Sequence, residues 1–268
     1  MNLIKRTLTA AVLLGSLFVI IQYAPNWVFF LFGQAVIVAA LLELYALAEK
    51  KDIHPQRALG IGLTLLAGLP FYFRTVPFEA ALFAGLLATG IYFVAATRSA
   101  EKLGRFPAAF AFTLFGAVYL GFTLSFIYRL RLEFGPLMLY FLAAVVFLGD
   151  TGAYLIGKPF GRHKMTPVAS PNKSWEGSAG GILFALAGAL LARSILDLEV
   201  PLATALLTAV VVHAAAQVSD PLESLFKRAA GVKDSSNALP GHGGFLDRID
   251  SLILAGPLFY FIVKHIWR

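Results

Sequence analysis

Four carboxylates stand near the ends of the last two apolar segments of the chain, at Asp220, Glu223, Asp247 and Asp250. Carboxylates that lie close together repel one another unless a positive charge lies between them. Oxygen ligands suit a hard cation such as Mg²⁺, which keeps coordination positions open for phosphate. The chain has no Cys and no paired His that would favour zinc. We therefore predict that Asp220, Asp247 and Asp250 bind a divalent cation, with Glu223 beside them.

A basic, glycine-rich segment separates these carboxylates in the sequence. It contains Lys227, Arg228 and Lys233, followed by Asp234 and by the run 240–244, which reads PGHGG. Glycine lets backbone N–H groups approach an anion closely, and Lys and Arg neutralise its charge. A run of Lys and Arg alone is more often a solvated loop. The glycines and carboxylates together favour a site that binds phosphate groups.

A second polar segment lies upstream, between Asp150 and Glu176. Ser174 is expected to cap the helix that follows, with Glu176 in its first turn. Trp175 is expected to anchor that helix at the membrane interface. These structural roles leave Lys173 and Asp150 unexplained, and both are therefore candidate functional residues.

The eighth apolar segment places a row of polar groups on one helical face if it continues as a helix. The row comprises His213, Gln217, Asp220 and Glu223. Pro221 removes one hydrogen bond and is expected to kink the helix beside Asp220. For His213 alone we favour packing through a hydrogen bond. For the carboxylates of Asp220 and Glu223 we favour a functional role. Two carboxylates this close repel each other unless a positive charge lies between them.

The composition places the chain in a membrane. Of its 268 residues, 59% are apolar and 14% are charged, and the mean hydropathy is +0.77. A soluble protein of this composition would need a larger core than the chain can enclose. Backbone polar groups in lipid must be satisfied within helices, and a helix of about 20 residues crosses the hydrocarbon core. We predict an all-α, polytopic integral membrane protein with about nine transmembrane helices, at 7–23, 27–48, 58–73, 76–97, 107–128, 135–157, 177–196, 201–219 and 249–266.

The distribution of basic residues predicts the orientation. With a cytoplasmic N-terminus, sixteen of the 22 Lys and Arg residues fall on the cytoplasmic side, as do the loops 158–176 and 220–248. The first segment is interpreted as a retained span, because no small-residue cleavage site follows it. Glu43, inside the second segment, is interpreted as approaching the interface. We divide the chain into N-terminal scaffold helices with candidate dimer contacts, 1–134, and a C-terminal catalytic region, 135–268.

Several known nucleotide-binding and catalytic motifs are absent. The chain has no GxxxxGK[ST] loop, no GxGxxG in a βαβ setting and no GxSxG elbow. A nucleotide would therefore be bound by another kind of site. The net charge of +7 comes from Lys and Arg in short loops, without a basic stripe interleaved with stacking aromatics. We expect no nucleic acid partner.

Three runs in the C-terminal half closely resemble the signature of the phosphatidate cytidylyltransferases, the CDP-diacylglycerol synthases. They are 224–228 (SLFKR), 233–235 (KDS) and 239–250 (LPGHGGFLDRID), and their spacing fits throughout. The upstream runs 150–154 (DTGAY) and 170–177 (SPNKSWEG) are also similar to motifs of that family. Two departures are visible. Ser219-Asp220-Pro221 stands where the family pattern has Gly-Asp followed by an apolar residue, and Asn172 stands where a second Lys or Gly is common.

The resemblance implies a membrane-embedded, all-helical enzyme of phospholipid biosynthesis, expected as a homodimer in the cell (inner) membrane. A phosphate oxygen of phosphatidate would attack the α-phosphorus of CTP, giving CDP-diacylglycerol and pyrophosphate. It also implies a divalent cation, Mg²⁺, with the number of cations left open. CTP would arrive from the cytosol, and the lipid tails would enter from the inner leaflet.

The resemblance assigns roles by position. The metal ligands are Asp220, Asp247 and Asp250, and these residues form the catalytic set together with Lys227 and Arg228. The basic residues would hold phosphates, and the others would position the substrates. The residues expected to bind substrate are Asp150, Ser170, Lys173, Ser174, Glu176, Glu223, Lys233, Asp234, His242, Gly243, Gly244 and Arg248.

Two other functions stay open at this point. A CTP-dependent kinase of a polyprenol lipid would release CDP in place of pyrophosphate. A transporter is the alternative outside enzymes, since intramembrane carboxylates also line ion pathways. Its carboxylates should lie near the membrane midplane, whereas those of this chain cluster at one side, beside a basic and glycine-rich loop.

Overall fold

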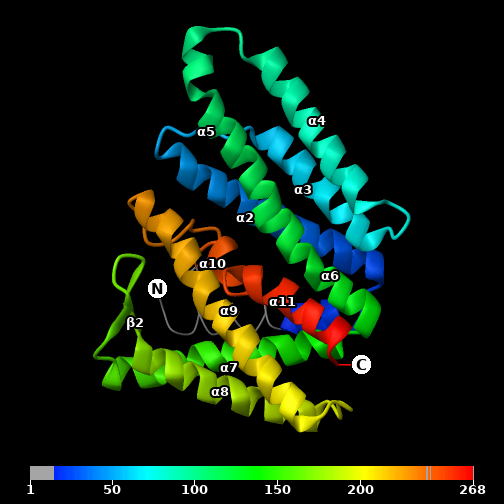
Figure 1. Ribbon diagram of the computed structural model, residues 1–268, viewed down its shortest axis with the longest axis vertical. Helices are drawn as coiled ribbons and strands as arrows, with labels where there is room; N and C mark the ends of the chain where they lie inside the picture. The colour runs from blue at the N-terminus through cyan, green and yellow to red at the C-terminus, as the bar shows by residue number, and fades with distance from the viewer. Residues whose placement is uncertain (1–14, 240, 242, 268) are drawn as a thin grey trace. The chain divides into compact units, whose positions relative to one another are not determined.

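The computed structural model describes residues 15–239, 241 and 243–267 of the chain (Figure 1). Most of this part is helical, and residues 15–23 form a helix that precedes α2. The helices are α2 (Asn26–Glu49), α3 (Arg57–Tyr72), α4 (Phe78–Ala96), α5 (Ala100–Gly116), the π-helix η1 (Ala117–Phe122), α6 (Thr123–Phe134), α7 (Leu137–Phe160), α8 (Trp175–Ile195), α9 (Leu202–Ala229), α10 (Leu246–Ile249) and α11 (Leu252–His265). The strands β1 (Lys164–Thr166) and β2 (Ser170–Ser174) form an antiparallel hairpin.

Within the described residues, six helices are long and apolar enough to cross a membrane. They are α2, α4, the continuous helix that α5, η1 and α6 form together, α7, α8 and α9. This confirms the prediction of an all-helical, polytopic membrane protein. The third predicted span has its expected length, because α3 has 16 residues, whereas the last is shorter than expected, because α11 has 14. The predicted first span, 7–23, lies partly outside the described residues.

The chain divides into two compact units that alternate along the sequence. The first contains the described residues up to Tyr128 together with Ala229–Arg248. The second contains Arg129–Arg228 and the residues from Ile249 onward. The segment 229–248, expected in the C-terminal region, therefore belongs with the N-terminal helices. The physical reason is a set of hydrogen bonds to Glu43 of α2, described below.

In the first unit, α2 packs against α3, α5 and η1. The Tyr45 ring of α2 is fully buried, and its hydroxyl donates to the main-chain oxygen of Thr113 at 2.7 Å. A Cβ at Gly60 of α3 or at Gly116 of α5 would overlap this ring. Glycine at these two positions therefore lets the helices approach one another closely.

In the second unit, α7 and α8 lie side by side (Figure 1). Their backbones approach closely, since a Cβ at Gly188 of α8 would lie 2.7 Å from the main-chain oxygen of Ala144. Small residues allow this kind of packing between membrane helices. Phe141 of α7 also stacks on Phe259 of α11, with ring centroids 5.5 Å apart. These contacts fix α7, α8 and α11 relative to one another, and the polar groups described below lie on or beside these helices.

Helix α9 continues through Pro221 to Ala229, well beyond its predicted end. The polar segment expected at 220–248 therefore begins after Ala229. Proline removes only one backbone N–H, and the basic Lys227 and Arg228 in the last turn complement the helix dipole. One helix, rather than a loop, thus positions the charged groups that follow Pro221.

The other polar segment and the last helix also differ from expectation in their bounds. The predicted loop 158–176 starts inside α7 and contains the hairpin of β1 and β2. The predicted span 249–266 is interrupted, because α10 is followed by a turn before α11 begins at Leu252. Asp250 lies in this turn, so that Asp247 and Asp250 do not share a face of one continuous helix.

Candidate active site

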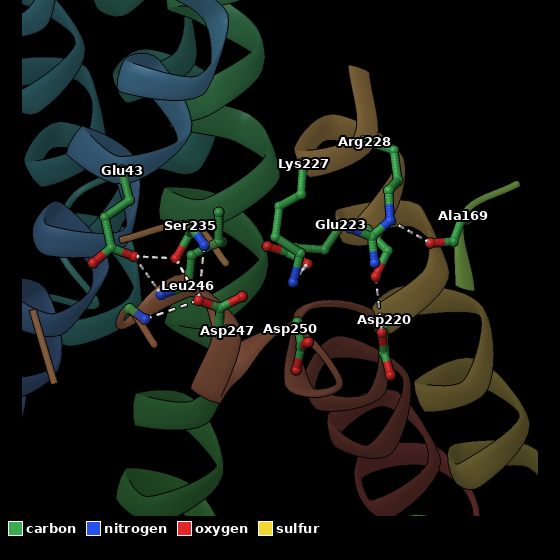
Figure 2. A network of polar contacts seen from close by, with 12 residues as sticks. Glu43, Ala169, Asp220, Glu223, Lys227, Arg228, Ser235, Leu246, Asp247 and Asp250 are labelled. Carbon is green, nitrogen blue, oxygen red and sulfur yellow. Dashed lines mark hydrogen bonds and ion pairs between the residues drawn. The ribbon is translucent and has the colours of Figure 1, made fainter. Parts of the chain in front are cut away.

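The last turns of α9 carry charged groups at helical spacing (Figure 2). Glu223 is fully buried, and its carboxylate lies 2.5 Å from Nζ of Lys227, one turn later. Ser224 Oγ donates to Oδ1 of Asp220 over 3.4 Å. A buried carboxylate is costly unless it is paired. The helix therefore places Glu223 and Lys227 as a buried ion pair one to two turns after the more accessible Asp220.

The hairpin contacts α9 through two side chains in the second unit. Nζ of Lys173, on β2, lies 2.8 Å from Oδ2 of Asp220. Nε of Arg228 donates to the main-chain oxygen of Ala169 at 3.3 Å (Figure 2). Lys173, for which the sequence offered no structural role, is thus the partner of a predicted metal ligand.

Asp250 lies in the turn before α11, near carboxylates from other elements. Burial, followed by the charges of Asp220 and Glu223, raises the pKa of the Asp250 side chain. The next residue, Ser251, donates from its hydroxyl to Oδ2 of Asp150 at 3.2 Å. The second unit therefore brings together Asp150 from α7, Asp220 from α9 and Asp250.

The donors in this group suit a hard cation by their chemistry. They are carboxylate oxygens, the ligands that Mg²⁺ prefers. Burial and, after it, repulsion by Asp220 and Glu223 raise the pKa of Asp250, and a bound cation would offset both. Within the described residues, no three His, Asp or Glu side chains converge closely enough to hold a metal ion. Oδ2 of Asp220 is paired with Lys173.

Asp247 lies in the first unit, in α10, and organises the segment before it. Its Oδ2 accepts hydrogen bonds from Ser235 N at 2.9 Å, from Ser235 Oγ at 2.8 Å and from Gly244 N at 2.8 Å. Gly243 has a φ of +75°, and a Cβ there would lie 2.7 Å from Oδ2 of Asp247. Glycine at 243 is therefore required both by the backbone conformation and by the nearby carboxylate.

Glu43 of α2 is a candidate that the sequence analysis missed. Its carboxylate accepts hydrogen bonds from the hydroxyls of Ser235 (2.8 Å) and Ser236 (2.7 Å) and from the backbone N–H groups of Phe245 (3.0 Å) and Leu246 (2.8 Å) (Figure 2). The partners lie 192 to 203 residues later in the chain. The one signal in the sequence is a carboxylate inside an apolar helix, and it does not identify these partners.

Carboxylates thus engage the backbone of the glycine-rich segment. We expected its N–H groups to approach a phosphate. In the structure, the N–H of Gly244 donates to Asp247, and those of Phe245 and Leu246 donate to Glu43. Close packing against two acidic side chains is therefore one physical reason for the glycines here.

The start of α8 orders the residues around the hairpin. Ser174 Oγ accepts a hydrogen bond from Gly177 N at 3.1 Å, which confirms the predicted N-cap. The carboxylate of Glu176 accepts hydrogen bonds from the backbone N–H groups of Arg162 (3.1 Å) and His163 (3.2 Å). Glu176, predicted to position substrate, here positions the chain that leads into β1.

His213 is fully buried in α9, with its Nε2 2.9 Å from Nε2 of Gln217. Gln217 in turn donates to the main-chain oxygen of Ser178 in α8 at 3.1 Å. These contacts confirm the interpretation of His213 as a packed, hydrogen-bonded residue. The hydrogen bond of Gln217 connects α9 to α8 at a point that precedes Asp220 in α9.

The remaining predicted substrate residues lie in more accessible places. Ser170 is half-buried at the start of β2. Lys233, Asp234 and Arg248 are exposed members of the first unit. His242 lies outside the described residues.

A known family and several known proteins match this chain over most of its length. A sequence model of the cytidylyltransferase family matches residues 4–266. A phosphatidate cytidylyltransferase of Staphylococcus epidermidis is 36% identical over 259 residues, which cover 94% of this chain and 96% of the relative. Proteins of the same name from Bacillus subtilis and Brucella suis are 31% and 35% identical, over 97% of this chain and over 97% and 92% of the relatives. Because these matches cover nearly all of its residues, the chain belongs to the cytidylyltransferase family.

Proposed function

We propose that the protein transfers the cytidylyl group of CTP to phosphatidate, giving CDP-diacylglycerol and pyrophosphate. The relatives that match almost the full chain are named for phosphatidate cytidylyl transfer. The structural observation that carries the proposal is the pairing of Lys173 with Asp220, close to Asp250. It places the Lys173 ammonium group, which is proposed to bind phosphate, beside Asp220, which is proposed to bind the cation together with Asp250.

The reaction needs alignment and charge neutralisation rather than a covalent intermediate. A phosphate oxygen of phosphatidate forms a bond to the α-phosphorus of CTP. The bond from this phosphorus to the oxygen that bridges to the β-phosphate breaks, and pyrophosphate leaves with the electron pair. The nucleophile is already an anion, so that no Ser or Cys nucleophile is required. Positioned positive charges lower the barrier for such a transfer.

Lys173, Lys227 and Arg228 bind the phosphate groups in this proposal. Lys173 and Lys227 are held beside Asp220 and Glu223 before substrate arrives. A triphosphate offers these ammonium groups more negative charge than a single carboxylate does. The planar guanidinium of Arg228 can bind two phosphate oxygens at once.

Asp220 and Asp250 hold Mg²⁺ in this proposal. The support is the set of oxygen-only donors and the raised pKa of Asp250, caused by burial and by neighbouring negative charges. When bound, the cation neutralises charge on the triphosphate and polarises a phosphoryl oxygen. Asp247 stays a ligand predicted from the sequence alone. The substrate roles of Asp150, Ser170, Ser174, Glu176, Glu223, Lys233, Asp234, His242, Gly243, Gly244 and Arg248 also stay predictions.

The site faces the cytoplasm of a cell (inner) membrane in this proposal, and the enzyme acts as a homodimer. The excess of Lys and Arg in the loops assigned to the cytoplasm supports the orientation. The homodimer rests on the family resemblance.

Since the chain has no Cys, a single Cys introduced for Lys233 reports the orientation. A membrane-impermeant thiol reagent should label it in inside-out vesicles and not in right-side-out vesicles.

Product analysis tests the activity. Purified protein in detergent, given CTP, phosphatidate and Mg²⁺, should release pyrophosphate and form CDP-diacylglycerol. Release of CDP with a polyprenol substrate would identify a lipid kinase instead. Folded protein that forms no product from CTP and phosphatidate would reject the proposal.

A further inference from the structure

Glu43 has no part in the chemistry proposed above, although its carboxylate makes four hydrogen bonds to the segment 235–246. A charged side chain inside an apolar membrane helix is costly and tends to serve a function. All four donors belong to the segment that leads to Asp247. Glu43 therefore connects α2 with the chain that carries this predicted metal ligand.

Ser235 links the two carboxylates directly. Its hydroxyl lies 2.8 Å from Oε2 of Glu43 and 2.8 Å from Oδ2 of Asp247, and its N–H donates to the same Asp247 oxygen at 2.9 Å. Because this hydroxyl has one proton, its hydrogen bonds to Glu43 and to Asp247 alternate. A displacement of Glu43 thus reaches Asp247 through a single intervening side chain.

The surroundings of Gly244, Phe245 and Leu246 restrict the conformations that these residues can adopt. Gly244 is buried, and a Cβ at this position would overlap Ser235 Oγ and the Glu43 carboxylate. The N–H groups of Phe245 and Leu246, at the start of α10, are satisfied by Glu43 from α2. The start of α10 is therefore held by a distant helix.

We propose that Glu43 is a positioning residue, which holds its four hydrogen-bond partners in the segment 235–246 so that the Asp247 carboxylate is presented for cation binding. The inference rests on the proposed function, in which Asp247 is a predicted ligand of Mg²⁺. Hydrogen bonds to an ionised carboxylate are about twice as strong as neutral ones. Removing the charge of Glu43 loosens this segment and misplaces Asp247.

Replacing Glu43 with Gln tests the proposal, because this change keeps the shape and removes the charge. A misplacement of about 1 Å costs roughly 10²-fold in rate, so we expect kcat to fall by about 10- to 100-fold. The Mg²⁺ concentration for half-maximal rate should rise, and KM for phosphatidate should stay unchanged. Glu43→Asp, which keeps the charge, should recover part of the rate. Glu49→Gln is the matched control, because this carboxylate of the same helix pairs with Arg57.

Hydrogen exchange gives a readout that is independent of activity. In Glu43→Gln, the amides of Phe245 and Leu246 should exchange faster than in the wild type, with unchanged exchange in α7 and α8. If Glu43→Gln does not fold, Ser235→Ala should give the same changes through the loss of the bridging hydroxyl.

Two outcomes would overturn the proposal. One is wild-type exchange at these amides. The other is a variant that only loses thermal stability, with wild-type kcat and Mg²⁺ requirement per folded molecule. A wild-type protein that releases no pyrophosphate would instead reject the proposed function, and the exchange measurement would still decide whether Glu43 fixes the segment.

Discussion

Nζ of Lys173 lies 2.8 Å from Oδ2 of Asp220, and the two side chains retain 26% and 31% of their exposure. An ion pair that is this accessible contributes about 0–1 kcal/mol to stability. In the proposed function, exchanging this pair for a cation on Asp220 and a phosphate on Lys173 would therefore cost little.

Replacing Asp220 with Asn should abolish most of the activity without unfolding the protein. The substitution keeps the shape of the side chain and removes the charge that is proposed to hold Mg²⁺. We expect kcat for pyrophosphate release to fall by roughly 10²–10³-fold. Asp197→Asn is the matched control, because Asp197 is exposed with a φ of 50°, a conformation that Asn adopts readily. Near wild-type turnover in Asp220→Asn would exclude Asp220 as a ligand of the proposed cation.

Breaking the buried pair of Lys227 and Glu223 should reduce stability. Lys227→Met leaves Glu223 buried without its lysine, a change that costs about 3–5 kcal/mol. The melting temperature in detergent should fall accordingly. The double variant Glu223→Gln/Lys227→Met should recover most of this stability and remain inactive, since Lys227 is proposed to bind phosphate. Full activity in the folded double variant would exclude that role.

Removing divalent cations should stop the reaction. Chelation with EDTA is expected to abolish pyrophosphate release, and excess Mg²⁺ should restore it. Mg²⁺ should also raise the melting temperature of the wild type, because a cation that binds only the folded state stabilises it, by about 2.7 kcal/mol at 100 times its Kd. In Asp250→Asn this thermal shift should shrink. An equal shift in both proteins would place the cation away from Asp250.

Close packing of α7 and α8 should make Gly188 intolerant of a methyl group. In Gly188→Ala the new Cβ would meet the main-chain oxygen of Ala144, and we expect a loss of about 1–3 kcal/mol. Gly90→Ala in α4 is the control, since a Cβ there has no atom within 4 Å. Alanine favours helix over glycine, so that this variant should match or exceed the wild-type melting temperature. Equal melting temperatures in the two variants would contradict the packing argument.

The kind of protein and the chemical groups of its site follow from the amino-acid sequence. Apolar runs of membrane length specify helices, because lipid offers no partners to backbone N–H and C=O groups. The cap at Ser174 was predictable because capping depends on a residue three positions away. The acidic, basic and glycine residues near the C-terminus indicated phosphate chemistry by their types alone.

Which of these groups contact one another depends on how the helices pack. Ser251 bonds to Asp150 across 101 positions of the chain, and Glu43 bonds to residues about 200 positions away. Contacts between residues this far apart in the chain produce no local sequence pattern. The sequence therefore indicates only an interfacial position for Glu43. The continuation of α9 to Ala229 was also missed, because a proline removes only one hydrogen bond and tertiary packing outweighs that loss. Local pattern reveals what a residue can do, whereas long-range packing selects its partner.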